Sequence, residues 1–320
     1  AAEPRQTERS SGVEGELASV DDIPGFDEIQ IPEGKKIKVG YLAQNETMQF
    51  CIYMGDALRD QAKRFGDQIE VEMVDARGLA ATQVSQAEDM VVKGVDVVVL
   101  HPIDQEASAP ALDIIVNAGI PLVTVNTNTV NKEIANAYVG VDDKEAGILA
   151  VQLMSQALSG EGTINVIKGL LGDPANENRM IGLEEELGNH PDISVGSAQA
   201  ADWDRGKAMN LTEDWLTSGR DFDGIIAMND EMAISAALAL DSVGITDVKI
   251  IGVDALDEAL ELIKAGKMYG TVFQNADAQG RGALNVALAA ALGMEIEKNY
   301  IIPYEAVTAE NVENYINVNQ

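Results

Sequence analysis

The stretch VDVVVLHPIDQEASAPALDIIVNAGIPLVTV, residues 95–125, shows the pattern that decides the fold. Two short apolar runs, at residues 95–100 and 120–125, enclose an amphipathic segment at residues 106–118 that ends before Gly119. Runs rich in β-branched residues predict strands, and a glycine directly after a helical segment is typical of a left-handed helix cap. A strand, a helix and a second strand in this order predict two parallel strands joined by a right-handed crossover.

The same alternation continues in both directions from this unit. Apolar runs predict strands buried on both faces at residues 37–42, 69–74, 95–100, 120–125, 137–141, 163–167, 193–198, 222–227, 248–253 and 269–273. The pattern restarts near Asp142 with a second set of similar length, which favours two sheets over one wide sheet. The predicted fold class is therefore α/β, with two doubly wound, Rossmann-like domains. Residues 1–36 show neither helical nor strand periodicity and are predicted to form an N-terminal tether or an extended strap.

The composition excludes several classes of protein. The 320 residues include 53 acidic and 22 basic side chains, which gives a formal charge of -31. A chain this acidic is repelled by DNA, RNA and anionic lipid, so no nucleic-acid partner is expected. One cysteine and two histidines exclude an intramolecular disulfide and a four-ligand zinc site, and no metal site is predicted.

The sequence motifs of common enzyme classes are also missing. The chain has no G-x-G-x-x-G after a strand, no G-x-x-x-x-G-K-[ST] and no G-x-S-x-G, the motifs of dinucleotide binding, phosphate binding and a nucleophilic serine. With His101 and His190 as the only histidines, few bases are available for a catalytic triad. We therefore expect a protein that is not an enzyme and that needs no cofactor.

In doubly wound sheets, ligands bind beyond the carboxyl ends of the strands. The residues at these positions are Gln44, Asp75, His101, Asn126, Gly169, Asp202 with Trp203, Asn229, Asp254 and Gln274. An amide side chain can pair with two adjacent hydroxyls and a carboxylate can accept from two, while an aromatic ring such as Trp203 or the nearby Phe50 covers the apolar face of a sugar. This composition predicts a site for a polyhydroxylated ligand. His101 is either a ligand contact or a structural histidine with satisfied hydrogen bonds.

Three motifs, in order along the chain, carry a family resemblance. They are ADWDR at residues 201–205, NDEMA at residues 229–233 and IGVD at residues 251–254. From Ile37 onward the chain resembles the type I periplasmic sugar-binding proteins, in particular the ribose-binding group of ABC-transporter receptors. The resemblance implies two lobes that are joined by a three-strand hinge and enclose a ligand. The implied N-terminal lobe is residues 37–140 with 275–303, and the implied C-terminal lobe is residues 141–274 with 304–320.

The resemblance also implies roles for single residues. Phe50 and Trp203 would sandwich the ligand between their rings. Asn229, Asp254 and Gln274 would form hydrogen bonds with its hydroxyl groups. These assignments agree with the strand-end positions identified from the order of strands and helices.

Several positions depart from the ribose-binding pattern and argue against ribose itself. The chain has His101 where Asn is frequent, Asn126 and Thr127 where Asp-Arg is usual, Glu177 where a second Arg is customary, Met48 where Asn is common, and Cys51 in place of an aromatic residue beside Phe50. A site with Asp254 and few cations should disfavour anionic ligands. The expected ligand is therefore a neutral sugar or polyol, such as a pentose, a hexose, a deoxy sugar, an inositol or a short alditol. An amino sugar fits only if Glu177 faces the cleft.

The predicted function is that of a solute-binding receptor outside the cytoplasm, which captures this ligand by hinge closure and delivers it to an ABC permease. We expect a monomer in the periplasm or another extracytoplasmic location, with or without a lipid anchor. Two alternatives remain open. A LacI-type effector-binding regulatory domain shares the core but requires a helix-turn-helix before residue 37. A chemotaxis or signalling receptor for a non-sugar ligand has the same fold.

Overall fold

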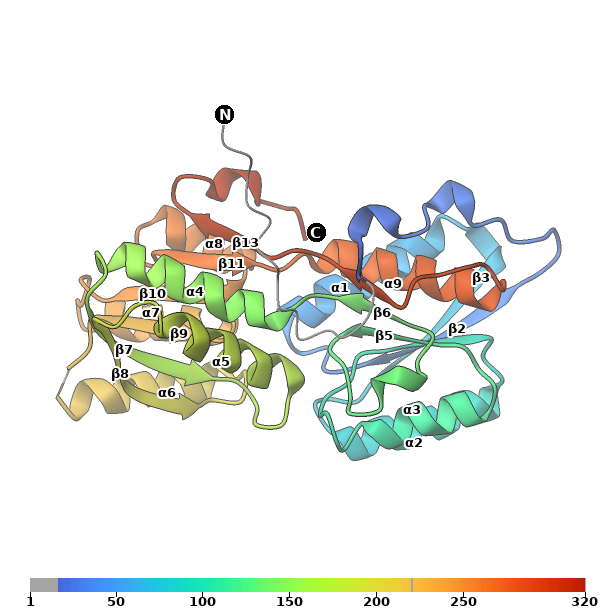
Figure 1. Cartoon of the computed structure of the whole chain (residues 1–320), viewed down its shortest axis with the longest axis horizontal. Helices are drawn as coiled ribbons and strands as arrows, with labels where there is room; N and C mark the ends of the chain where they lie inside the picture. Colours follow the sequence, from blue (N-terminus) through green and yellow to red (C-terminus); the bar gives the residue numbers. More distant parts are fainter. Residues whose placement is uncertain (1–16, 220, 320) are drawn as a thin grey trace.

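Two β-sheets organise the chain in the computed structural model, which describes residues 17–219 and 221–319 (Figure 1). The first sheet contains, in spatial order, β1 (Leu17–Ser19), β12 (Asn299–Ile301), β6 (Ala137–Gly140), β5 (Leu122–Asn126), β4 (Val97–Leu100), β2 (Ile37–Ala43) and β3 (Ile69–Asp75). The second contains β13 (Glu305–Thr308), β11 (Gly270–Phe273), β10 (Lys249–Asp254), β9 (Gly224–Ala227), β7 (Gly162–Lys168) and β8 (Ile193–Ala200). All neighbouring strands are parallel except β11 and β13, which are antiparallel.

Helices cover both faces of each sheet, as expected for a doubly wound fold. In the first lobe, α1 (Gln49–Lys63) and α9 (Ala276–Ala291) pack on one face, and α2 (Ala80–Lys93) and α3 (Ala109–Asn117) on the other. In the second lobe, α4 (Asp143–Ala157) pairs with α5 (Pro174–Leu187). The opposite face carries α6 (Arg205–Thr217), α7 (Asp230–Ser242) and α8 (Asp257–Lys264). The α/β, doubly wound fold class predicted from the sequence is confirmed.

The chain passes between the two sheets three times. It leaves the first sheet after β6 to enter α4, returns after β11 to enter α9, and leaves again between β12 and β13. The connecting residues are 141–142, 274–275 and 302–304. We propose lobe boundaries at these crossings, with residues 37–140 and 275–303 in one lobe and residues 141–274 and 304–320 in the other.

Each of the ten predicted apolar runs contains a strand, but two of them are not buried on both faces. β3 and β8 lie at the outer edges of their sheets, and most of their residues are half-buried or exposed. An edge strand has a neighbour on one side only, so its side chains are covered less completely. The expectation of burial on both faces was therefore wrong for these two strands.

The described residues of the N-terminal segment form an extended strap, one of the two structures predicted for this segment. β1 pairs in parallel with β12, and the ring of Phe26 lies 4.7 Å from that of Phe65, between ring centroids. Ile29 is buried, and the Asn285 side chain donates to the Pro24 carbonyl oxygen at 2.9 Å. These contacts hold the segment against the first lobe. Residues 1–16, which belong to the same predicted segment, lie outside the described residues.

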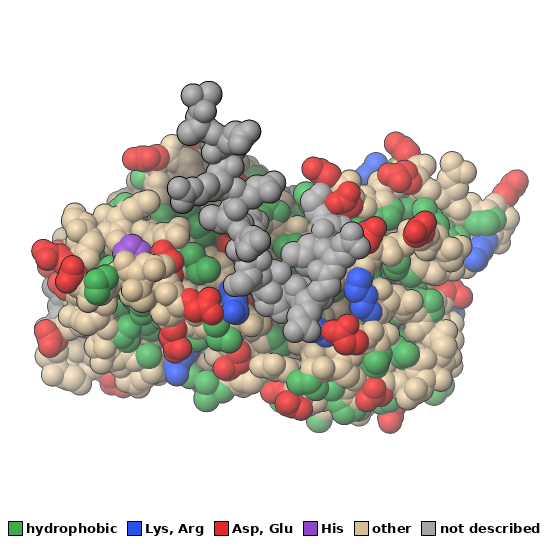
Figure 2. Space-filling view, viewed as in Figure 1, with side chains coloured by type: hydrophobic (Ala, Val, Ile, Leu, Met, Phe, Trp, Pro, Cys, Tyr) green, Lys and Arg blue, Asp and Glu red, His purple; other side chains and the backbone are tan. Residues whose placement is uncertain are grey.

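Acidic side chains are distributed over the visible surface of both lobes, with few basic ones between them (Figure 2). No helix in the described chain combines the length and the hydropathy needed to cross a membrane.

Candidate functional site

A cavity lies between the carboxyl ends of the two sheets. It forms where the chain order reverses in each sheet, since β2 lies between β3 and β4, and β7 lies between β8 and β9. The first lobe lines it with Gln44, Met48, Phe50, Cys51, His101, Asn126 and Thr127. The second lobe contributes Asp173, Ala175, Arg179, Trp203, Asn229 and Asp254, and the second crossing contributes Gln274.

Eleven of the twelve site residues predicted from the sequence line this one cavity, and Glu177 does not. Glu177 lies in the first turn of α5, where its carboxylate accepts from the Gly172 amide at 3.3 Å and from the Asn176 side chain at 3.1 Å. The helix directs this side chain to its own N-terminal loop. The expected alternative of an amino sugar paired with Glu177 therefore has no structural basis.

Trp203 forms one wall of the cavity in a constrained position. Asp202 and Trp203 both have left-handed backbone angles, with φ of 55° and 65°, which turns the chain sharply at the end of β8. The indole ring lies directly against Gly169, where an added Cβ would be 2.2 Å from the ring atoms. The indole N–H donates to Oδ2 of Asp173 at 3.0 Å. The ring is therefore fixed both by packing and by a hydrogen bond.

His101 is almost completely buried, with 1% exposure, and among the described residues neither ring nitrogen meets the geometry of a hydrogen bond, although the Asn126 side chain lies close to the ring. Burial lowers the pKa of His101 to about 3, and the neighbouring Asn126 side chain only partly offsets this effect. The ring is therefore neutral at physiological pH, with one donor and one acceptor nitrogen. A structural histidine would have satisfied these atoms, so the geometry favours the ligand-contact alternative.

Gln274 and Asn229 also bring polar atoms to the cavity wall. Oε1 of Gln274 accepts from Arg179 at 3.0 Å, while its buried Nε2 has no partner in the described chain. Oδ1 of Asn229 caps α7 by accepting from the Met232 amide at 3.0 Å. In both side chains the oxygen is occupied, and in Gln274 the buried amide nitrogen is the group left to donate to a ligand.

Asp254 lies at the carboxyl end of β10 in a strained turn. Its φ is 126° and that of Ala255 is 62°, both in the left-handed range that non-glycine residues rarely adopt. The buried Asp230 carboxylate holds this turn by accepting from the Leu256 amide at 2.9 Å and from the Thr271 hydroxyl at 2.7 Å. Burial raises the pKa of Asp254 well above its ordinary value, and Asp230 raises it further.

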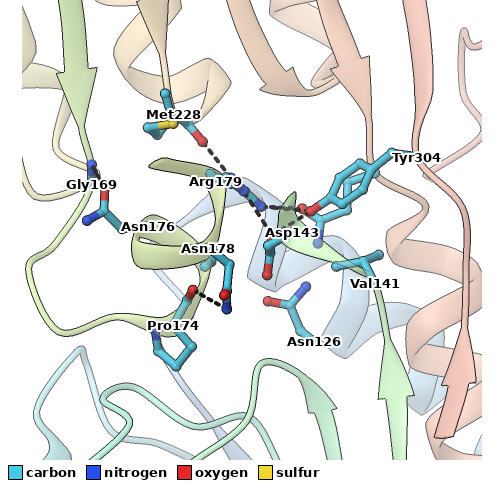
Figure 3. Close-up of polar contacts among 12 residues, drawn as sticks. Asn126, Val141, Asp143, Gly169, Pro174, Asn176, Asn178, Arg179, Met228 and Tyr304 are labelled. Carbon is cyan, nitrogen blue, oxygen red and sulfur yellow. Dashed lines mark hydrogen bonds and ion pairs between the residues drawn. The ribbon is translucent and has the colours of Figure 1, made fainter. Parts of the chain in front are cut away.

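Arg179 connects the cavity to the crossings (Figure 3). Its Nε donates to Asp143 at 2.9 Å and its Nη2 donates to the Tyr304 hydroxyl at 3.1 Å, while Nη1 donates to the Met228 carbonyl oxygen. Arg179 also donates to Gln274. Its partners thus include one at or beside each crossing: Asp143 at the first, Gln274 at the second and Tyr304 at the third. Arg179 therefore joins the crossings to each other and also lines the cavity.

The charges around the cavity favour a neutral ligand. Arg179 is the one cationic side chain among the described lining residues, and it is already paired with Asp143. Burial acts against its charge, but Tyr304, Asp143 and Asp254 raise the pKa of Arg179 above its ordinary value. An anionic ligand would meet buried carboxyl groups and no unpaired cation, which is unfavourable.

The two lobes touch each other around the cavity. Gln44 donates to Asp173 at 3.1 Å, and the Tyr53 hydroxyl donates to Asp257 at 2.8 Å. The Gln105 amide donates to the carbonyl oxygen of Gly172 at 3.2 Å. These hydrogen bonds join opposite sides of the cleft, so the structure is a closed form.

The fold and the enclosed site define a two-lobed binding protein. Residues 39–295 match the family described as periplasmic binding protein domain, and the chain belongs to this family. It is 32% identical to a xylitol-binding protein of Mycolicibacterium smegmatis over 77% of this chain and 70% of that protein.

Two solved structures have the same architecture. A solute binding protein of an ABC transporter from Bacillus halodurans, with bound myo-inositol, is 35% identical, with a TM-score of 0.85 over 89% of this chain and 99% of that chain. A myo-inositol binding protein from Caulobacter, also bound to myo-inositol, is 29% identical, with a TM-score of 0.82 over 89% of this chain and 97% of that chain.

Proposed function

We propose that this protein is an extracytoplasmic receptor that captures a small neutral polyol between its lobes and delivers it to an ABC permease. The observation that carries this proposal is the cavity between the lobes, with buried polar atoms on His101 and Gln274 that have no partner among the described residues. Leaving such atoms unpaired in a dry interior is costly, so a ligand with hydroxyl groups is the natural partner.

The lining suggests how the ligand lies. Trp203 and Phe50 come from opposite lobes and would cover the two apolar faces of a ring or carbon chain. The amide nitrogens of Gln274 and Asn229 would donate to hydroxyl oxygens. The Asp254 carboxyl group and the neutral His101 ring would accept from hydroxyl hydrogens. A hydroxyl group both donates and accepts, and a polyol therefore matches this mixture of groups.

Within this class a cyclitol or alditol is the preferred candidate over ribose. The relatives that bind myo-inositol or xylitol support this choice, since these ligands are neutral and carry a hydroxyl on every carbon. In this chain, Arg179 is already paired with Asp143 and offers no free charge to an anionic ligand. We infer that phosphorylated and acidic sugars are rejected.

The remaining parts of the proposal follow from the family. Hinge closure about the three crossings would trap the ligand, and the closed form would be the state presented to the permease. Such a receptor acts outside the cytoplasm as a monomer, performs no chemistry on its ligand and needs no cofactor. Against the regulator alternative, the described residues 17–36 contain a short strand and two 3-10 turns and no helix-turn-helix.

A thermal-shift screen tests the proposal. The purified protein, stripped of carried-over ligand, is heated with myo-inositol, xylitol, ribitol, D-ribose, galacturonic acid, glucosamine and an inositol monophosphate. A ligand at 100 times its Kd stabilises the native state by about 2.7 kcal/mol. We expect a shift with a neutral polyol and none with the acidic, phosphorylated or amino compounds.

Two variants test whether the polyol binds in the cavity. Trp203→Ala should abolish the polyol shift because it removes one wall, whereas Trp215→Phe, in α6 outside the cavity, should retain it. A shift with a charged sugar alone, or an unchanged response of Trp203→Ala, would show that the proposed ligand class or site is wrong.

A further inference from the structure

Asp173 was not among the residues identified from the sequence, yet its carboxylate occupies the point where the two lobes and the aromatic wall meet. It lies at the N-cap of α5 and is 2% exposed. Oδ1 accepts from the Ala175 amide at 2.8 Å, which fixes the carboxylate on the end of the helix. Oδ2 is then left for other donors.

The first of these donors is the indole of Trp203, at 3.0 Å. Both residues belong to the second lobe, so this bond does not depend on whether the cleft is open or closed. The Trp203 ring also packs against Gly169, which helps to hold it in place. Packing fixes the plane of the ring, and the hydrogen bond to Asp173 fixes which edge points into the lobe.

The second donor comes from the opposite lobe. Nε2 of Gln44 donates to the same Oδ2 at 3.1 Å, and also to the Pro102 carbonyl oxygen at 3.2 Å. Nearby, the Gln105 amide donates to the Gly172 carbonyl oxygen at 3.2 Å, which also joins the first lobe to the loop that carries Asp173. The bond between Gln44 and Asp173 therefore exists only when the lobes are together.

We propose that Asp173 is a positioning residue that serves both the orientation of Trp203 and the closed state of the lobes. One buried carboxylate oxygen holds the ring for the ligand and, on closure, accepts from Gln44 across the cleft. Burial raises the pKa of Asp173 to about 7, and the hydrogen bonds from Ala175 and Trp203 act against this shift. Hydrogen bonds to the ionised form are stronger than those between neutral groups, so both bonds to Oδ2 are strongest above neutral pH. Asp173 thus links the first lobe to the aromatic wall without being assigned a contact of its own with the ligand. This inference rests on the proposed function for its affinity measurements but not for its spectroscopic ones.

The test uses Asp173→Asn, which has the same shape but cannot accept with both oxygen positions. The asparagine can keep either the cap of α5 or the bond to Trp203, but not both. The matched control is Asp204→Asn. Asp204 is an exposed N-cap residue of α6, next to Trp203 in sequence, that accepts from the Lys207 amide at 2.8 Å. A third variant, Gln44→Ala, removes the bond across the cleft and leaves the bond to the indole.

The first measurement needs no ligand. In a Trp215→Phe background, emission reports on Trp203 alone. Asp173→Asn should shift its emission maximum to longer wavelength and increase its quenching by acrylamide, while Asp204→Asn and Gln44→Ala should leave both unchanged. Wild-type emission and quenching in Asp173→Asn would overturn the positioning role, even if no polyol binds.

The second measurement is the Kd of the polyol found by the screen. We expect Asp173→Asn to weaken binding by about tenfold to a hundredfold, and Gln44→Ala to weaken it by about tenfold. The double variant should bind about as weakly as Asp173→Asn alone, because both changes remove the same bond. Strictly multiplicative losses would overturn the coupling across the cleft, and so would wild-type affinity in Asp173→Asn.

Discussion

The buried histidine His101 makes the stability of this protein depend on pH. The pKa of folded His101 is about 3, below its ordinary value of 6.5, because burial disfavours the charged ring. As pH falls, the unfolded chain therefore binds the proton first. The contribution of the neutral ring to stability is complete above about pH 6.5 and is lost progressively as the pH falls from 6.5 towards 3.

The substitution His101→Asn should remove this pH-dependent contribution to the free energy of unfolding. Each pH unit within that range corresponds to about 1.4 kcal/mol, so between pH 6.5 and 4.5 the wild type should lose about 2–3 kcal/mol more than the variant. The free energy of unfolding at the two pH values, from urea titrations, measures the difference. An equal acid dependence in wild type and His101→Asn would mean that the buried ring is protonated in the native state.

Site residues that directly follow a strand could be predicted from the sequence, whereas those farther from a strand end could not. His101 directly follows β4 and Gln274 directly follows β11, so the order of strands and helices located them. Asp173 follows β7 only after a loop of several residues, and the strand-end rule stopped at Gly169. Arg179 lies more than one turn inside α5, and only the fold shows that this face of the helix looks into the cavity.

At the scale of elements, the close pairing of α4 and α5 depends on two glycines. An added Cβ at Gly182 would lie 2.0 Å from the Lys144 carbonyl oxygen, and one at Gly147 would lie 2.0 Å from the Arg179 carbonyl oxygen. Both atoms belong to backbone, which cannot move aside as a side chain can. The two helices could accept a methyl group only by separating, which would displace the cavity-lining end of α5.

Gly182→Ala should therefore destabilise the protein by about 3 kcal/mol or more, at the upper end of overpacking costs. Gly206→Ala in α6 is the control, since its nearest neighbour is the exposed Asp204 side chain, 3.2 Å from the added Cβ. There alanine should remain within about 1 kcal/mol of glycine, because it favours the helix. Thermal unfolding of the two variants checks this, and equal melting temperatures would mean that the α4–α5 contact can relax.

The elements that the sequence did not reveal are short strands near the sheet edges. β1 and β12 have three residues each and β13 has four, and none contains a long apolar run. Their pairing depends on neighbours that are distant in sequence, such as β11 for β13. Buried central strands, in contrast, must be apolar on both faces, and that local requirement is what made them predictable.

At the scale of the whole molecule, electrostatic repulsion is the dominant long-range term. The formal charge is -31, and the acidic side chains are distributed over both lobes (Figure 2). Ion pairs such as Lys36 with Asp67, at 3.6 Å, are exposed and contribute little. The carboxylates greatly outnumber the basic side chains, so their repulsion opposes the compact state.

Salt should therefore stabilise this protein. The screening length falls from about 10 Å at 0.1 M salt to about 3 Å at 1 M, which removes repulsion between surface carboxylates while weakening only the minor exposed pairs. Between these concentrations of KCl at pH 7, we expect Tm to rise by at least the roughly 1.5 °C that 1 kcal/mol produces in a chain of 320 residues. Near the sequence pI of about 4.2 the net charge vanishes, and the same increase in salt should have little effect. A Tm at pH 7 that stays constant or falls with KCl would mean that the exposed pairs outweigh the repulsion between the lobes' carboxylates.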